Sequence, residues 1–115
     1  NDSVLEINRI NLLSAVDRVS TIANEKSPVI KFNFLENIIN LNTVNNENST
    51  ATEDLDANYN GKNIEIGFNS KYVMDIINNL EDDNIFINLK DNSSPITISE
   101  KSKPNLIYVL MPMRV

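Results

Sequence analysis

Neither cysteine nor histidine occurs in this sequence of 115 residues. Without cysteine the chain can form neither a disulfide nor a thiolate metal site, which fits a reducing compartment. Without histidine it lacks the commonest general base and the commonest nitrogen ligand of metal ions. Any catalysis would have to use carboxylates, lysine, tyrosine or hydroxyl groups.

Positive charge is also scarce, because ten Lys and Arg residues stand against sixteen Asp and Glu residues, for a net charge of −6. A protein that binds nucleic acid by itself needs clustered cations, since much of its affinity comes from phosphate contacts. We therefore expect any contact with DNA to be local or indirect. No apolar run approaches the roughly 20 residues that span a bilayer, and no signal-like leader opens the chain, so we expect a soluble protein with no membrane partner.

The length fits one domain, predicted over residues 1–115, and is sufficient to bury a sizeable core. The first residue is Asn1 and not Met, so we expect the chain to be a piece of a longer protein.

The first half of the chain predicts a strand, a helix and three more strands. Residues 4–7 form a short apolar strand. From Ile10 the apolar residues recur every three or four positions, which predicts an amphipathic helix of about four turns that Ser27-Pro28 interrupts. Strands are predicted at 29–34, at 38–43 after a turn at 35–37, and at 52–59 after a polar loop.

The second half predicts the same series again. Asn60-Gly61 indicates a hairpin into a strand at 64–68. A helix begins at Ser70 with Asn69 as its N-cap. Strands follow at 84–90, 96–98 and 106–111. The last is continuously apolar and flanked by prolines, which predicts a strand buried on both faces.

This pattern predicts an α+β fold made of two βαβββ repeats, with antiparallel sheets and both helices packed on one side. The similarity of Leu5-Glu6-Ile7 to Ile64-Glu65-Ile66, each before a helix, supports the repeat.

Two possible chemical sites have simpler explanations. The segment Asp56–Gly61 matches the first half of a calcium-binding EF-hand loop, but Gly67 stands where the last ligand should be Glu, so we predict a turn. The carboxylates of 53–56 and 81–83 could form an acid and base pair or hold Mg²⁺, but nothing fixes their geometry, and we expect solvated edges and turns. We predict no catalytic residue, no metal site and no cofactor.

Three stretches together resemble the C-terminal domain of the bacterial β sliding clamp, a subunit of DNA polymerase III. They are Asn24-Glu25-Lys26, the run Ile64–Asn69 followed by Tyr72-Val73 and Asp75, and the run Tyr108–Val115. The resemblance covers nearly the whole chain.

The resemblance implies a protein without enzymatic activity that acts in DNA replication. Its protomer has three domains of like fold, and two protomers close head to tail into a ring around duplex DNA. The ring is a processivity factor, because it tethers polymerases and raises their effective concentration at the primer end. The implied partners are the catalytic subunit of DNA polymerase III, the clamp loader, translesion polymerases and mismatch-repair proteins, all bound through short linear motifs in the cytoplasm, at the nucleoid.

The resemblance also implies three groups of site residues. The peptide-binding pocket would comprise Asn69, Tyr72, Ser93, Pro95, Val109, Leu110, Met111, Pro112, Met113, Arg114 and Val115. The ring interface would include Ile22, Glu47 and Glu53, and the residues facing DNA would be Arg18 and Lys71.

Two other functions remain open from the sequence. One is a stand-alone adaptor that uses the same peptide pocket without any ring. The other, which the carboxylates favour only weakly, is a hydrolase.

Overall fold

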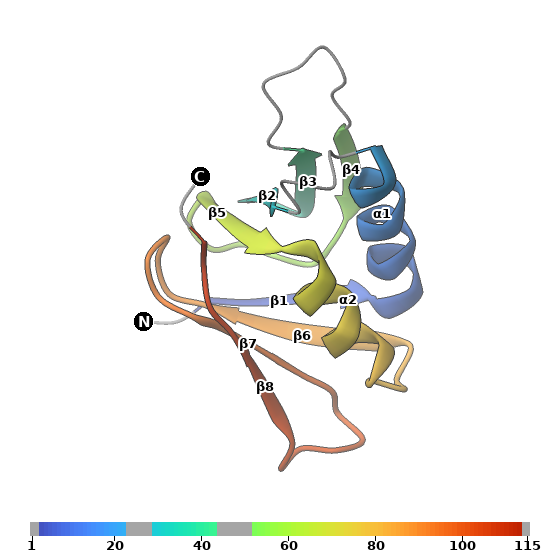
Figure 1. Cartoon of the computed structure of the whole chain (residues 1–115). Coiled ribbons are helices and arrows are strands. Elements are labelled where there is room, and N and C mark those ends of the chain that lie inside the picture. The colour runs from blue at the N-terminus through green and yellow to red at the C-terminus, as the bar shows by residue number, and fades with distance from the viewer. Residues whose placement is uncertain (1–2, 23–28, 44–51, 114–115) are drawn as a thin grey trace.

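The computed structural model describes residues 3–22, 29–43 and 52–113 (Figure 1). Its elements in chain order are β1 (Ser3–Asn8), α1 (Arg9–Ile22), β2 (Val29–Leu35), β3 (Ile38–Thr43), β4 (Thr52–Asp56), β5 (Ile64–Asn69), α2 (Ser70–Asn78), β6 (Asn84–Leu89), β7 (Ile96–Ser99) and β8 (Ile107–Leu110). The order is βαβββ followed by βαβββ, so the predicted α+β repeat is confirmed.

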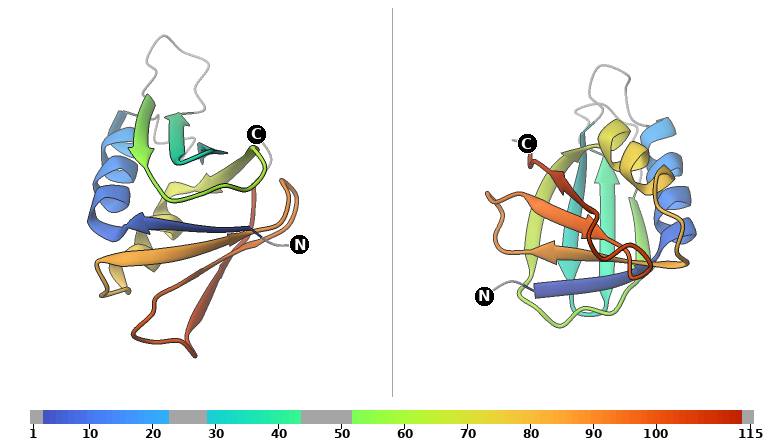
Figure 2. Two further views of the ribbon diagram at one scale, coloured as in Figure 1. Left: turned by 180° about the vertical axis from the view of Figure 1, so that it is seen from behind. Right: turned by 90° about the horizontal axis from the view of Figure 1, so that it is seen from below.

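The strands form two four-stranded antiparallel sheets, in the orders β1-β6-β7-β8 and β4-β3-β2-β5. Each sheet takes its first or last strand from the other repeat, since β1 pairs with β6 and β5 pairs with β2. The helices α1 and α2 pack against each other on one side of the molecule, as predicted (Figures 1 and 2).

The core lies between the sheets and the helices, and the sequence periods explain it. On β2 the alternate residues Ile30, Phe32 and Phe34 are buried, and the rings of Phe32 and Phe68 meet edge to face with centroids 5.4 Å apart. On α1 the buried residues are Leu12, Ala15, Val16 and Val19, spaced by three and four. No helix in the described ranges is long and apolar enough to span a membrane.

The predicted hairpin at Asn60-Gly61 is wrong. Strands β4 and β5 lie at opposite edges of one sheet, and the segment between them crosses from one edge to the other. On the way, Asn58 exchanges two backbone hydrogen bonds with Glu6 of β1, at 3.0 and 2.8 Å. The strand predicted to continue to Tyr59 therefore ends at Asp56, and the Tyr59 ring enters the core.

The tight turn between two strands lies earlier, between β2 and β3, where the sequence also predicts a turn. Leu35 pairs with Ile38, and Asn37 adopts the left-handed region with φ 58°. Asn tolerates this conformation better than other residues with a side chain.

The prediction that the last strand is buried on both faces is also wrong. Strand β8 is the edge of its sheet, and its burial alternates: Leu110 is 4% exposed, whereas Ile107 and Val109 are 56% and 59% exposed. An antiparallel edge strand packs one face on the core, and nothing in the described part of the chain covers the other.

Candidate functional site: an apolar cleft between α2 and β8

A cleft of about 510 Å³ lies between α2 and the segment that follows β8. We call it the α2–β8 cleft. Its lining residues are Asn69, Tyr72, Asp75, Ile76, Val109, Leu110, Met111, Pro112 and Met113.

Helix α2 forms the first wall. The side chain of Asn69 caps the helix by accepting the Lys71 backbone N–H at 2.9 Å, which confirms the predicted N-cap. Val73 and Ile77 are buried in the core. Tyr72 falls on the neighbouring face, where its side chain is 62% exposed and lines the cleft.

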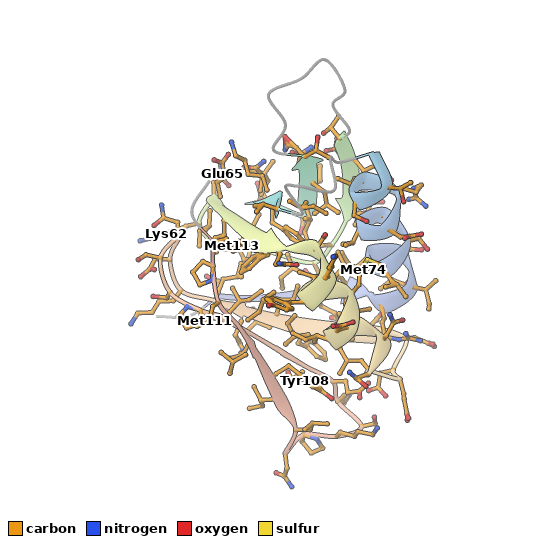
Figure 3. The ribbon with its side chains drawn as sticks, in the orientation of Figure 1. Lys62, Glu65, Met74, Tyr108, Met111 and Met113 are labelled. Atoms are coloured by element: carbon orange, nitrogen blue, oxygen red, sulfur yellow. The ribbon has the colours of Figure 1, made fainter. Side chains whose placement is uncertain are left out.

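The second wall is the end of β8 and the residues after it. Leu110 anchors this segment in the core, while Val109 and Met111 remain 59% and 62% exposed. The Met113 backbone N–H donates to the Gly67 carbonyl at 2.7 Å, so the segment is held against β5. In Figure 3, Met113 lies beside β5 and Met111 lies farther from it.

The chemistry of the cleft suits an apolar ligand. Val, Met and Pro side chains offer apolar surface, and the flexible thioether of Met adapts to ligands of different shape. The Tyr72 ring adds an amphipathic wall, because its hydroxyl can hydrogen-bond at the rim while its face packs on carbon.

Seven of the eleven residues predicted for the peptide pocket line this cleft: Asn69, Tyr72 and all five of Val109–Met113. Ser93 instead lines a neighbouring cavity of about 390 Å³, which shares Pro112 and Met113 with the cleft. Pro95 is exposed just before β7 and lines neither cavity. Arg114 and Val115 lie outside the described residues.

The sequence interpretation missed Asp75 and Ile76 as lining residues. Asp75 follows Tyr72 by three positions and Ile76 follows it by four, so helical geometry places both side chains beside that of Tyr72. That spacing is the signal that could have identified them.

The β6–β7 turn that carries Ser93 is held by Asp91. The Asp91 carboxylate accepts the Ser93 backbone N–H at 3.0 Å and the Ser94 backbone N–H at 2.8 Å. Hydrogen bonds from the Ser94 side chain and from the Ser93 backbone lower the pKa of Asp91 from its ordinary 3.8 to about 2.

One residue predicted to face DNA, Arg18, forms an ion pair with one predicted for the ring interface, Glu53. Arg18 of α1 binds Glu53 of β4 through two hydrogen bonds of 2.7 Å. The hydrogen bond from Arg18 lowers the pKa of Glu53 and raises that of Arg18. Lys71 is exposed in the first turn of α2. Glu47 lies outside the described residues, as does the side chain of Ile22, the last residue of α1.

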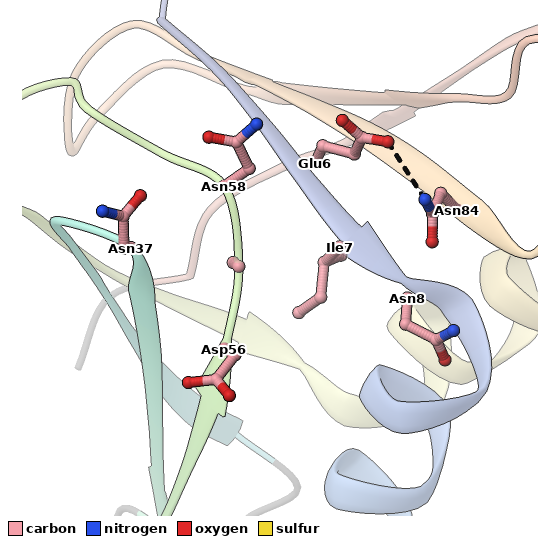
Figure 4. Close-up of a pocket in the computed structure, with 8 residues that line it drawn as sticks. Glu6, Ile7, Asn8, Asn37, Asp56, Asn58 and Asn84 are labelled. Atoms are coloured by element: carbon pink, nitrogen blue, oxygen red, sulfur yellow. Dashed lines mark hydrogen bonds between the residues drawn. The ribbon is translucent and has the colours of Figure 1, made fainter.

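A third cavity, of about 400 Å³, has a different character (Figure 4). It lies between β1 and the crossing segment after β4, and six of its eight lining residues have a side-chain amide or carboxylate. Glu6 and Asn84 hydrogen-bond to each other there at 3.0 Å. The α2–β8 cleft is larger and presents much more apolar surface, so it is the stronger candidate for a site that binds an apolar anchor.

Comparison with known proteins identifies relatives along the whole chain. Residues 1–114 match the family described as DNA polymerase III beta subunit, C-terminal domain. The beta sliding clamp of Escherichia coli K12 is 35% identical over 114 residues, which is 99% of this chain and 31% of the relative.

Solved structures agree in fold as well as in sequence. A DNA polymerase III subunit beta sliding clamp from Bartonella birtlesii, bound to griselimycin, superposes with a TM-score of 0.94 at 38% identity, covering 100% of this chain and 31% of that one. A Caulobacter crescentus beta sliding clamp has a TM-score of 0.93 at 34% identity, covering 98% of this chain and 30% of that one. That structure holds polyethylene glycol at a region described as tethering the β-motif.

The chain spans about a third of the length of the relatives that it matches, 31% in the first three. Over that length the match includes both sheets and both helices. By sequence and by fold, the chain belongs to the family of the C-terminal domain of the DNA polymerase III beta subunit, the bacterial sliding clamp.

Proposed function

We propose that this chain is the third domain of a sliding clamp and that its α2–β8 cleft captures short linear motifs of replication and repair proteins. The observation that carries the proposal is the exposure of Tyr72, Val109 and Met111, each more than half accessible, around one cleft of about 510 Å³. Apolar side chains gathered at a concave site are typical of peptide recognition.

The family suggests which proteins would carry the motif. They are the catalytic subunit of DNA polymerase III, the clamp loader, translesion polymerases and mismatch-repair proteins. A leucine and an aromatic anchor of the motif would occupy the cleft, and the adaptable Met walls would allow several sequences to bind. The domain does no chemistry in this role; it holds other proteins in place.

The ring function places β4 and the end of α1 against the first domain of a second protomer. Among the described strands, β4 is at one edge of its sheet, and three of its five residues are acidic: Glu53, Asp54 and Asp56. An exposed acidic edge disfavours pairing with like strands and favours a basic partner. In the closed ring, duplex DNA is encircled without sequence recognition, in the cytoplasm at the nucleoid.

The test is a titration of this chain with a fluorescent peptide that carries a Gln-x-x-Leu-x-Phe-like motif. We expect weak, saturable binding, because a cleft formed by one domain offers few anchoring contacts. Tyr72→Ala and Met111→Ala should each weaken it by about three- to thirtyfold, the loss expected when a central anchor contact is truncated.

Two controls make the titration decisive. Ile107→Ala, an equally exposed apolar change on β8 outside the cleft, should leave binding unchanged. Circular dichroism should show each variant folded. Absence of binding to the wild-type chain, or equal loss in Ile107→Ala, would contradict the assignment of the cleft.

A further inference from the structure

The two walls of the α2–β8 cleft are joined at the end away from Met113. After α2 the chain turns at residues 79–83, and between β7 and β8 it turns at residues 100–106. These two turns contact each other through hydrogen bonds that involve Glu100.

Glu100 is buried, with only 2% of its surface exposed. Its Oε1 accepts two backbone N–H groups from the turn after α2, those of Glu81 and Asp82, each at 2.7 Å. Its Oε2 has no hydrogen-bond partner among the described residues. Burying an unpartnered carboxylate oxygen costs free energy, so the useful part of this side chain is the Oε1 acceptor.

A second set of hydrogen bonds joins the same two turns, with the donors in the turn between β7 and β8 and the acceptor in the turn after α2. The Asp82 carboxylate accepts the Ser102 backbone N–H at 2.9 Å and also the Ser102 hydroxyl. These hydrogen bonds, that of the side chain foremost, lower the pKa of Asp82. The Asp82 carbonyl in turn accepts from Arg9 Nε at 3.0 Å, at the start of α1. We call Glu81, Asp82, Glu100 and Ser102 the Glu100 clamp.

The other end of the cleft has its own connection. The bond from Met113 N–H to the Gly67 carbonyl ties the second wall to β5, two residues before the Asn69 cap of α2. The walls of the cleft are therefore connected at both ends. The Met113–Gly67 hydrogen bond connects them near the start of α2, and the Glu100 clamp connects them beyond the end of α2.

We propose that Glu100 is a positioning residue for the α2–β8 cleft. Through Oε1 it holds the end of α2 against the turn that leads into β8, and thereby sets the distance between the wall with Tyr72 and the wall with Met111. It does not line the cleft and does not touch the peptide. This inference rests on the proposed peptide-binding function.

Two substitutions of Glu100 separate the effect of its hydrogen-bond acceptor from the effect of its charge. In Glu100→Gln the amide oxygen can still accept both N–H groups, and the amide nitrogen replaces the unpartnered oxygen. In Glu100→Ala both N–H groups lose their acceptor. Gln should therefore preserve the cleft and Ala should not.

The experiment measures the Kd of the fluorescent motif peptide for both variants, with Ile39→Val as a control. Ile39 is buried in β3 of the other sheet, so its mild core substitution loosens the fold away from the cleft. We expect Glu100→Ala to weaken binding about three- to tenfold. This is the size expected when hydrogen bonds to a charged group are lost and only part of the lost free energy appears in the free energy of peptide binding. Glu100→Gln and Ile39→Val should stay within about twofold of wild type.

Binding by Glu100→Ala as tight as that of the control would overturn the inference, as would an equal loss in Glu100→Gln. Should Glu100→Ala fail to fold, two milder variants separate the contributions to the clamp. Asp82→Ala removes only the bonds to Ser102 and tests whether those bonds contribute to the clamp. For Glu100 itself the fallback is Glu100→Asp, whose side chain is one methylene shorter and withdraws the acceptor from the Glu81 and Asp82 N–H groups; unchanged binding in Glu100→Asp would overturn the inference.

A readout without peptide separates this inference from the proposed function. Amide exchange measured by NMR should be slow at Glu81 and Asp82 in wild type and in Glu100→Gln, and fast in Glu100→Ala. The Met111 and Met113 methyl resonances should shift in Glu100→Ala alone. If wild type binds no peptide, the proposed function fails, and these resonances still decide whether Glu100 positions the walls; unshifted methyls would show that it does not.

Discussion

At the scale of single residues, Asn60-Gly61 does not have the role that its composition suggests. Asn60-Gly61 has the composition of a hairpin turn, yet the left-handed residue of a hairpin is Asn37. Gly61 is needed for a different reason. A Cβ placed on it would lie 2.6 Å from Ser3 Cβ and 2.6 Å from the Tyr59 hydroxyl oxygen. The absence of a side chain there lets the crossing segment approach β1.

We predict that Gly61→Ala destabilises the protein by about 1 to 3 kcal/mol, the usual range for overpacking in a tight site. Urea denaturation followed by circular dichroism measures the change. Ser3→Gly combined with Gly61→Ala should recover part of the loss, because it removes one of the two obstructing groups. Lys62→Ala, an exposed neighbour, should cost little. A Gly61→Ala protein as stable as wild type would show that the segment can move aside.

A second prediction concerns the contribution of Asp91 to stability at low pH. Its folded-state pKa of about 2 lies below the ordinary 3.8, so the unfolded state binds more protons between these values. The stabilisation from the ionised carboxylate is therefore complete above about pH 4 and is lost as the pH falls through about 2. Asp91→Asn should flatten the fall in unfolding free energy over this window, measured by urea titrations at several pH values. Asn92→Ala, in the same turn but not titratable, should keep the wild-type slope; a steep fall in Asp91→Asn would assign the acid sensitivity elsewhere.

At the scale of elements, β8 shows how an apolar run can be exposed. Its residues are apolar on both sides, but only Leu110 and the half-buried Tyr108 pack inward. The outward residues Ile107 and Val109 remain accessible, and Val109 contributes to the α2–β8 cleft. The outer side of this edge strand is therefore apolar without being part of the core, and Val109 is the outward residue that lines the cleft.

This alternation predicts opposite effects for neighbouring substitutions. Leu110→Ala should cost about 2 to 5 kcal/mol of unfolding free energy, because it leaves a cavity under the sheet. Val109→Ala should cost no more than about 0.5 kcal/mol, as for other exposed positions, yet should weaken peptide binding. Thermal or urea denaturation together with the peptide titration gives both quantities. Equal destabilisation by the two substitutions would mean that β8 is covered on both faces.

At the scale of the whole molecule, the two repeats are not independent units. Strand β1 belongs to the sheet of the second repeat, and β5 belongs to the sheet of the first. In addition, the two helices pack against each other. Each repeat alone would lack one strand of its sheet and would expose the core face of the other three.

We therefore predict that fragments 1–59 and 60–115 are each largely unfolded alone and regain ordered structure when mixed. The physical reason is that the pairs β1–β6 and β2–β5 form only when both repeats are present. Circular dichroism of the separate and mixed fragments tests this. A cooperative unfolding transition in either fragment alone would contradict it. A mixture of fragment 1–59 with a 60–115 fragment carrying Ile66→Asp should not recover, because Ile66 is buried opposite Phe32.

The sequence was sufficient for the elements and for most of the candidate site. Local periodicity gave both helices and the repeat, because alternation and three-to-four spacing are set by each element's own geometry. The N-cap Asn69 was recognisable for the same reason. The resemblance at Tyr108–Val115 pointed to residues of which Val109–Met113 line the cleft.

What the sequence could not decide is which elements become neighbours. The pairing of β1 with β6 and of β5 with β2 joins strands far apart in the chain, so no local pattern encodes it. That pairing separates β4 from β5, turns Asn60-Gly61 into part of a crossing and makes β8 an edge. The same long-range packing brings Arg18 to Glu53 and Glu100 to the turn after α2. The sequence by itself determined each strand and helix through short-range sterics and burial, and only the tertiary structure decided edges, crossings and the cleft, because these depend on contacts between distant segments.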